Sequence, residues 1–259
     1  YEIYQCDWSS DVCSSDLIAA DALGPDKVHA VMMPSQYTAG MSCEDALAEA
    51  KALGVRYSEI AIKPMYDAFM SALAGEFAGR AADTTEENLQ SRIRGTLLMA
   101  MSNKTGAIVL TTGNKSEMGT GYATLYGDMA GGFAVLKDIS KMLVYRLANY
   151  RNSLSPVIPQ RVITRAPSAE LRPDQTDQDS LPPYDVLDGI MEAYVEHNQG
   201  LRAIEAQGYA RKDIERVVHL LRISEYKRRQ APIGIRITPR GFGKDWRYPV
   251  TNKYRHLFE

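Results

Sequence analysis

The sequence predicts an α/β fold, with a mainly parallel sheet flanked by helices and a helical C-terminal half. Three short segments, at residues 28–33, 55–62 and 107–110, have the pattern of strands, and the last of them (AIVL) is an apolar run typical of a buried strand. Segments with helical periodicity lie between them, and this alternation is typical of parallel strands whose crossover helices cover both faces of the sheet. From residue 184 onward the pattern is mostly helical.

The composition is that of an ordinary globular domain, with 259 residues, a net charge of −2 and a pI near 6.2. No apolar run approaches the roughly 18 residues of a membrane span, and the net charge gives no general attraction for nucleic acid. Three cysteines form no C-x-x-C pair, and four histidines stand singly. We therefore expect a reducing, cytoplasmic compartment, no structural metal site, and neither a membrane nor a nucleic-acid partner.

The N-terminal residues 1–16 (YEIYQCDWSSDVCSSD) have neither strand nor helix periodicity, so we expect a loop or a non-native tail there. From residue 17 the pattern becomes regular, with a helix that stops at Gly24. A capping box of Ser42 and Asp45 is expected to open a second helix that ends at Gly54, and residues 65–77 are expected to form a third.

A second capping box, Thr84 with Glu87, is expected to open a helix that continues to about residue 102. Asn88 and Arg92 are four residues apart and therefore share one face of this helix. Two interpretations stay open. The face grips an anionic or carboxamide-bearing ligand, or it is a solvated face on which Glu87 pairs with Arg94.

A glycine-rich stretch at residues 111–132 (TTGNKSEMGTGYATLYGDMAGG) contains six of the 19 glycines. It begins where a strand passes into a helix, which is where open α/β sheets bind ligands. Lys115 would supply a phosphate partner and Glu117 a magnesium ligand, while the glycines let backbone N–H groups approach an anion. A capped turn with solvated charges is the alternative.

The next helical pattern, residues 138–150, places Ile139, Met142, Leu143 and Leu147 on one stripe, which we expect to be core. Lys141 lies off that stripe. Residues 161–171 are expected to be extended, and the polar residues 171–183 to form a mobile loop of the kind that acts as a lid.

Two further helices are expected over residues 184–198 and 212–226, and the chain beyond residue 232 is irregular. The last of these helices runs into Lys227, Arg228 and Arg229. On the simplest interpretation these cations stabilise a helix C-terminus.

Four motifs in this order closely resemble the NAD synthetase family, from about residue 17 to the C-terminus. They are ENLQSRIRG (87–95), the glycine-rich stretch, RAPSAELRPDQTDQD (165–179) and EYKRRQAP (225–232). A further segment, RITPRGFGKDWRYP, resembles the bacterial glutamine-dependent branch, in which the synthetase domain follows a nitrilase-like glutaminase domain.

The resemblance implies an N-type ATP pyrophosphatase fold, which is adenine nucleotide α-hydrolase-like, and a carbon–nitrogen ligase activity. In this family the carboxylate of deamido-NAD attacks the α-phosphate of ATP with release of pyrophosphate, and ammonia then displaces AMP to give NAD. Mg²⁺ and lysines neutralise the charge that gathers on the phosphates. The resemblance also implies a homodimer, with glutamine as the native source of ammonia.

Site residues are carried over position by position. Thr112, Lys141 and Ser168 match ATP contacts. Asn88, Arg92, Glu117 and Lys227 match positions that hold deamido-NAD, and Glu117 also matches the magnesium ligand. Asp128, in the YGD triplet, is a further candidate on the same grounds. No residue is singled out as a catalytic acid, base or nucleophile.

One family motif, the pyrophosphate loop SGG-x-D-S, is not found. Counting back from Asp21, it would fall on residues 7–12 (DWSSDV), where only Asp11 coincides with the pattern. We therefore expect a synthetase domain over residues 17–259 that has lost its first strand and this loop, with weakened ATP binding. We expect no glutaminase domain in this chain.

Two other classes of function compete with this interpretation. One is a non-catalytic fragment that binds deamido-NAD or dimerises. The other is a different N-type ATP pyrophosphatase ligase, such as a GMP-synthetase-like or tRNA-modifying enzyme, which would need other substrate motifs.

Overall fold

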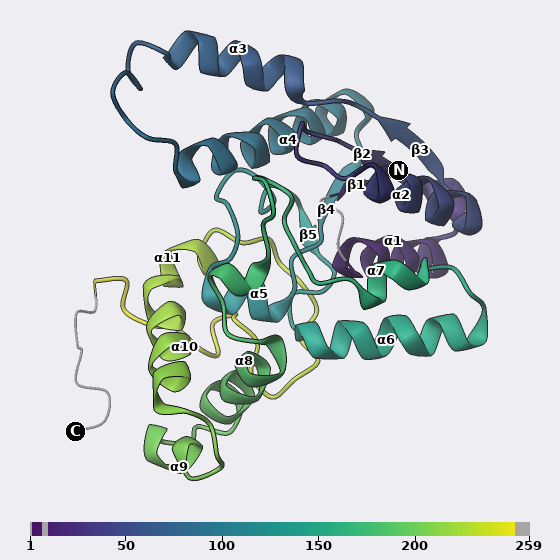
Figure 1. The fold of residues 1–259 in the computed structure, drawn as a ribbon. Coiled ribbons are helices and arrows are strands. Elements are labelled where there is room, and N and C mark those ends of the chain that lie inside the picture. Colours follow the sequence, from purple (N-terminus) through teal and green to yellow (C-terminus); the bar gives the residue numbers. More distant parts are fainter. Residues whose placement is uncertain (1, 7–9, 252–259) are drawn as a thin grey trace.

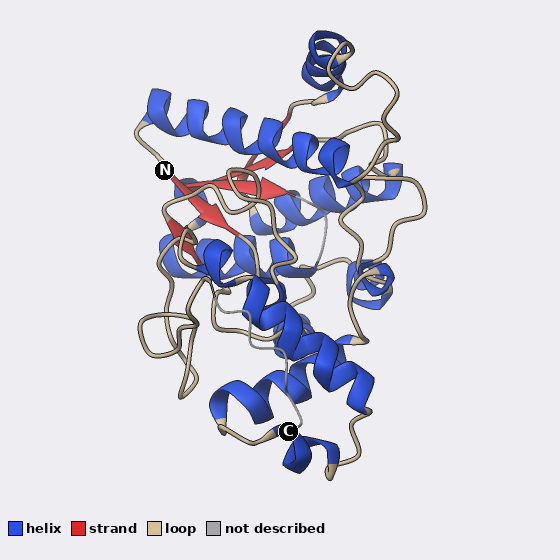
Figure 2. Ribbon diagram, turned by 90° about the vertical axis from the view of Figure 1, so that its left-hand side faces the viewer, coloured by secondary structure: helices blue, strands red, loops and turns tan. Residues whose placement is uncertain are grey.

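The computed structural model describes residues 2–6 and 10–251. Its centre is a parallel sheet (Figures 1 and 2), which has five strands. The strands are β1 (Glu2–Cys6), β2 (Val28–Met32), β3 (Arg56–Glu59), β4 (Ile108–Thr111) and β5 (Phe133–Ala134), in the order β3-β2-β1-β4-β5. Every pairing between neighbours is parallel. This confirms the predicted α/β class with a parallel sheet.

Strand β1 is the main departure from the sequence prediction. An irregular segment was expected over residues 1–16, but β1 lies in the middle of the sheet, with Glu2 in register with Val28 on one side and Ile108 on the other. Helix α1 (Ser10–Leu23) contains residues 10–16 of that segment. Two flanking strands supply hydrogen-bonding partners that the local sequence does not reveal. Whether residues 1–16 are native stays a prediction, and residues 7–9 lie outside the described residues.

Helices cover both faces of the sheet (Figure 2). Helices α1, α2 (Gly40–Leu53) and α6 (Lys141–Leu154) lie on one face, where Leu17, Met32 and Ala148 share a core. Helices α3 (Lys63–Leu73) and α4 (Thr84–Thr105) lie on the other, where Val31 and Val109 pack against α4. Adjacent strand residues such as Val31 and Met32 point to opposite faces, as a strand requires.

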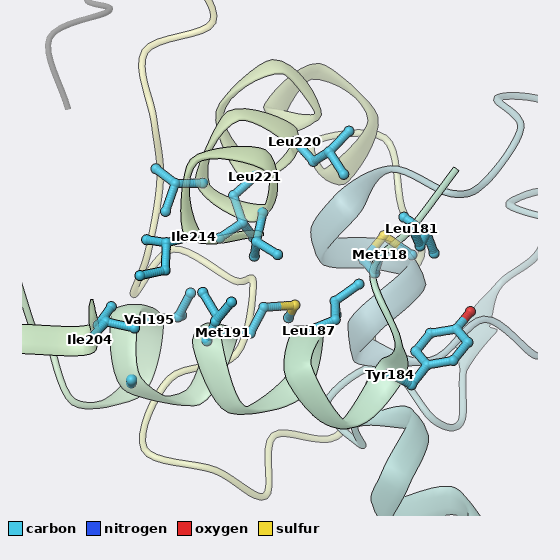
Figure 3. Packing of buried hydrophobic residues seen from close by; sticks show 14 of the residues in the cluster. Met118, Leu181, Tyr184, Leu187, Met191, Val195, Ile204, Ile214, Leu220 and Leu221 are labelled. Atoms are coloured by element: carbon cyan, nitrogen blue, oxygen red, sulfur yellow. The ribbon is translucent and has the colours of Figure 1, made fainter. Parts of the chain in front are cut away.

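The C-terminal half is helical, as predicted. It contains α7 (Gln160–Thr164), α8 (Tyr184–Met191), the π-helical turn Glu192–Glu196, α9 (Leu201–Glu205), α10 (Arg211–Ile223) and α11 (Glu225–Arg228). Leu187 and Met191 of α8 pack against Ile214 and Leu221 of α10, and Met118 of α5 (Lys115–Thr120) joins the same core (Figure 3). This core attaches the helical half to the sheet through α5.

The C-terminal ends of the helices were predicted from the sequence more accurately than their N-terminal starts. Gly24, Gly54 and Gly106 each follow a helix with a φ angle between 72° and 92°, which a residue with a side chain rarely adopts. The predicted box of Ser42 and Asp45 is wrong, because α2 starts at Gly40 and those side chains bind Glu170 and Arg161.

The capping box of α4 lies one residue earlier than predicted. Asp83 and Glu86 form it, in place of Thr84 and Glu87. In the long loop before α4, several neighbouring side chains can cap, and the local sequence alone does not choose among them.

The predicted core stripe of α6 is also wrong. Val144 and Ala148 are buried, together with Lys141, whereas Met142 and Leu147 are 39% and 36% exposed. The helix is turned so that Ala148 meets α1, a tertiary contact that periodicity alone could not reveal.

One connecting segment differs in part from expectation, and the expected mobility of the next stays a prediction. Residues 161–171 begin in helix α7 and are not a single extended run. Residues 171–183 contain one 3₁₀ turn, Asp177–Asp179, and the side chain of Gln90 donates a hydrogen bond of 2.8 Å to the carbonyl of Leu171. Across the described part of the chain, no helix has the length and apolar character needed to cross a membrane.

Candidate functional site

A cavity of about 430 Å³ opens at the carboxyl ends of β1 and β4, the edge at which open parallel sheets bind ligands. Six segments that are distant in the sequence line it. They contribute Asp11 (α1), Asn88 and Ser91 (α4), Thr112 and Glu117 (β4–α5), Lys141 (α6), Ser168 and Asp177 (loop) and Lys227 (α11). Six of the seven predicted site residues are therefore brought together.

The turn from β4 into α5 is fixed by a capping box. The side chain of Asn114 accepts a hydrogen bond of 3.0 Å from the backbone N–H of Glu117, and the Glu117 carboxylate accepts one of 3.3 Å from the Asn114 N–H. The amide of Asn114 also donates to Asp11 at 3.1 Å. The cap thus places Glu117 and Asp11 at the same end of the cavity.

Lys141 is the fully buried centre of this end. Its ammonium group pairs with the carboxylate of Asp11 and lies 3.5 Å from a carboxylate oxygen of Glu117. It also lies 5.4 Å from the centre of the Tyr184 ring. Burial by itself lowers the pKa of Lys141, but the carboxylates of Asp11 and Glu117 outweigh it and raise that pKa above its ordinary value. Lys141 therefore stays charged.

Acidic groups outnumber this ammonium group. Asp11, Glu117 and the buried Asp177 all act electrostatically on Lys141. Burial raises the pKa of Glu117, and the nearby Asp11 raises it further, against the effect of Lys141. Burial also raises the pKa of Asp177, whose carboxylate accepts a hydrogen bond of 2.7 Å from Tyr184. This end of the cavity would favour an added cation.

The opposite wall is formed where residues 121–132 pack against α4. Thr124 donates from its hydroxyl to Asn88 at 2.8 Å, and Asp128 accepts from the Thr124 N–H at 2.6 Å. A side chain on Gly95 would lie 2.7 Å from the carbonyl oxygen of Tyr126. The absence of a side chain at Gly95 lets the two backbones approach closely enough to make this wall.

Lys227 closes the wall from α11. Its ammonium group donates hydrogen bonds of 2.7 Å to the carbonyls of Gly121 and Ala123. Burial lowers the pKa of Lys227, while Asp128 acts in the opposite direction. A role limited to stabilising a helix terminus does not account for these contacts.

Two predicted residues do not line the cavity. Arg92 is exposed, and its Nε donates at 3.3 Å to the carbonyl of Leu125. Lys115 is buried, with Nζ at 2.8 Å from Asp138 and 2.7 Å from Glu196, so the prediction that it is a phosphate partner is wrong. Lys115 and Glu117 are two residues apart on α5 and therefore point to different sides of the helix.

Sequence reasoning did not assign Asp177 to the site, although it stands within the quoted RAPSAELRPDQTDQD motif. Tyr122 was also missed. Each lies in a loop whose path depends on tertiary packing, and only the motif could have drawn attention to them.

The fold and the cavity define an α/β protein with a polar site at the carboxyl edge of a parallel sheet, the arrangement that was expected from the resemblance to N-type ATP pyrophosphatases. Residues 10–231 match the family described as NAD synthase. The chain belongs to this family.

Individual relatives agree with this assignment. The chain is 57% identical over 240 residues to a glutamine-dependent NAD(+) synthetase of Acinetobacter baylyi, covering 92% of this chain and 44% of that protein. It is 53% identical over 241 residues to the Thermotoga maritima protein of the same name, covering 92% and 42%. The chain thus spans less than half the length of these curated relatives.

A solved structure is also similar. The glutamine-dependent NAD+ synthetase of Acinetobacter baumannii, in complex with adenosine diphosphate, matches with a TM-score of 0.63 and 50% sequence identity. The match covers 96% of this chain and 45% of that one. The family match begins at residue 10, so it includes part of the segment in which no resemblance was expected.

Proposed function

We propose that this chain carries out the synthetase reaction, the ATP-dependent amidation of deamido-NAD to NAD through an adenylated intermediate, with release of AMP and pyrophosphate. The observation that supports it most is the buried ammonium of Lys141, held beside Asp11 and Glu117 at the carboxyl edge of the sheet. A fixed cation at this point can stabilise negative charge as it develops on a phosphate.

Thr112, Lys141 and Ser168 are proposed to contact ATP, and Asn88, Glu117 and Lys227 to hold deamido-NAD. Two observations support this division. Lys141 and Thr112 lie at the sheet edge, and Asn88 lies on the wall formed by α4. Arg92 is proposed to reach deamido-NAD from outside the cavity, near an interface in a homo-oligomer, because its side chain is exposed on the same helix as Asn88.

Mg²⁺ fits the carboxylates of this end, with Glu117 and Asp11 as the proposed ligands. Among the described residues, no group of three His, Cys, Asp or Glu side chains could hold a metal ion alone. Magnesium commonly binds through one or two carboxylates, with water and substrate phosphates completing its shell. When bound, Mg²⁺ would supply further neutralisation of phosphate charge, and Lys141 would keep its own place between the carboxylates.

The nitrogen donor at this site is proposed to be ammonia, derived from glutamine by a glutaminase domain that is not among these 259 residues. We place the reaction in the cytoplasm, because Cys13 and Cys43 are free thiols.

One observation favours a second candidate, a fragment that binds deamido-NAD without turnover. Only Asp11 of the pattern SGG-x-D-S is present in residues 7–12, so the glycines that let a loop close around pyrophosphate are missing.

The test supplies ATP, Mg²⁺, deamido-NAD and ammonium to this chain and to a variant carrying SGG-x-D-S at residues 7–12, and measures NAD and AMP. We expect equal amounts of NAD and AMP, at a much higher rate in the variant, and none with glutamine in place of ammonium. Equal rates would refute the role given to the loop. Calorimetric binding of deamido-NAD without turnover by either protein would favour the second candidate, and neither binding nor turnover would reject both.

A further inference from the structure

Helix α6 begins at Lys141, so the backbone of the central lysine belongs to a helix N-terminus. Such a terminus leaves four N–H groups without partners inside the helix. The preceding residue, Ser140, makes no capping hydrogen bond with its own side chain. The cap must therefore come from elsewhere in the fold.

Two residues from other helices supply it. The hydroxyl of Ser116, on α5, accepts a hydrogen bond of 2.9 Å from the N–H of Lys141. A carboxylate oxygen of Asp188, on α8, accepts one of 2.8 Å from the N–H of Met142. The Ser116 hydroxyl donates to the other oxygen of Asp188, so the carboxylate holds both parts of the cap.

This arrangement is buried, with Ser116 and Lys141 fully enclosed and Asp188 9% exposed. A carboxylate beside a helix N-terminus is favourable, and more so when it is partly shielded from solvent. Ser116 also precedes Glu117, so the same cap joins the start of α6 to the helix that carries the carboxylate beside Lys141. Asp188 itself does not line the cavity.

We propose that Asp188 is a positioning residue which, through Ser116 and the first turn of α6, fixes the Lys141 ammonium between Asp11 and Glu117. Its consequence for catalysis rests on the proposed function. The position of the Lys141 ammonium group is independent of that function, so it can be measured without turnover.

The first test is a proton–nitrogen correlation spectrum of the lysine ammonium groups of the whole chain, with Lys141 assigned from Lys141→Gln. Lys115 serves as the internal reference, because it is also buried but is paired with Asp138 and Glu196. In Asp188→Asn, whose amide cannot reproduce both acceptors, we expect the Lys141 hydrogens to exchange about tenfold faster or their signal to disappear, with Lys115 unchanged. In Asp138→Asn we expect the Lys115 hydrogens to exchange faster, with Lys141 unchanged. Asp185→Asn, an exposed change on the same helix, should affect neither.

Unchanged Lys141 exchange in Asp188→Asn would overturn the proposal, as would equal loss of both lysine signals. So would the absence of a protected Lys141 signal in the unaltered chain. Lys141→Gln separately tests the proposed function: if it leaves Mg²⁺-ATP affinity unaltered, the role of Lys141 fails whatever the spectrum shows.

A second measurement separates positioning from general structural support. Effects of Asp188→Asn and Lys141→Gln on Mg²⁺-ATP affinity are measured singly and together, in the variant with the restored loop. If Asp188 acts through Lys141, the double change weakens binding no more than Lys141→Gln alone. Additive losses would show that Asp188 acts by another route.

Discussion

At the residue scale, Lys141 combines a structural role with its proposed chemical one. Its charge compensates Asp11, which is almost fully buried, and it lies beside Glu117. A buried charge that loses its partner is left both desolvated and unpaired. Lys141, which is proposed to contact ATP, should therefore also stabilise the protein when no ligand is bound.

Lys141→Met is expected to lower the free energy of unfolding by about 3 kcal/mol, because it leaves Asp11 buried beside Glu117 without a cation. Urea denaturation measures this loss. Lys63→Met is the matched control, since the Lys63–Asp67 pair on α3 is more than half exposed and should be worth less than about 1 kcal/mol. Similar losses in the two variants would contradict the role given to Lys141.

At the element scale, the wall of the cavity depends on the contact between α4 and residues 121–132. Gly95→Ala would place a methyl group 2.7 Å from the backbone oxygen of Tyr126 and 2.8 Å from that of Gly127. Because neither backbone atom can turn away, we expect a loss of about 1–3 kcal/mol in unfolding free energy. Weaker binding of deamido-NAD should accompany it.

The control for this change is Gly40→Ala at the start of α2, where an added methyl group meets no atom within 4 Å. It should be neutral or slightly stabilising, since alanine favours a helix. Chemical denaturation of both variants measures the difference, and a Gly95→Ala protein as stable as Gly40→Ala would refute the packing argument.

A second feature at this scale is the interface between α1 and α2, where polar side chains face the core. Ser14, Ser15 and Asp16 of α1 are buried, as is Glu49 of α2, which acts electrostatically on Asp16. Within the described residues, the hydroxyls of both serines and one oxygen of Asp16 have no hydrogen-bond partner. Such groups are costly, so this interface should contribute less to stability than an apolar one of the same shape.

This interface predicts a pH dependence of stability. Burial raises the pKa of Glu49 to about 8, while the Cys13 thiol acts to lower it and Asp45 to raise it. The folded protein therefore holds the Glu49 proton more tightly than the unfolded chain does. The contribution of Glu49 to stability is fully present below a pH of about 4.5 and is lost as the pH rises through 8. Over this pH range the free energy of unfolding should fall by a few kcal/mol, because each unit of difference between the folded and unfolded pKa of Glu49 is worth about 1.4 kcal/mol.

Urea titrations between pH 5 and pH 8 measure this slope. Glu49→Gln should reduce this slope, because the amide keeps the shape and does not titrate, whereas Asp16, Glu117 and Asp177, whose pKa values burial also raises, still titrate. Glu44→Gln, an exposed change on the same helix, should keep the slope of the unaltered chain. A Glu49→Gln protein with an unchanged slope would assign the pH dependence to other groups.

The same elements show how far sequence reasoning could go. Gly24 and Gly54 were predicted correctly as helix ends because the signal is local: glycine accepts the positive φ angle that follows a helix. The buried face of α6 and the partners of Lys115 could not be predicted, since both depend on helices far away in the sequence. The site residues came from family motifs, and their roles stay predictions.

At the scale of the whole molecule, the cavity joins the sheet to the helical half. Asp11 and Glu117 come from the sheet side, whereas Lys227 comes from α11 and Asp177 from the loop before α8. A ligand that touches both sides favours the folded state over any state in which they separate. Ligand binding should therefore be visible as a change in global stability.

If Mg²⁺ binds as proposed, its presence should determine how much ATP changes the global stability. The carboxylates beside Lys141 repel free ATP, so we expect Mg²⁺-ATP to raise the melting temperature and ATP with EDTA to raise it far less. At a ligand concentration about 100 times the Kd the stabilisation is about 2.7 kcal/mol. For a chain of this size it corresponds to a rise of roughly 5–10 °C, measured by calorimetry. Glu117→Gln should reduce the difference between the two conditions, whereas Glu192→Gln, an exposed change, should not. Equal shifts with and without Mg²⁺ would contradict the proposed metal ligand and leave Lys141 as the neutralising group.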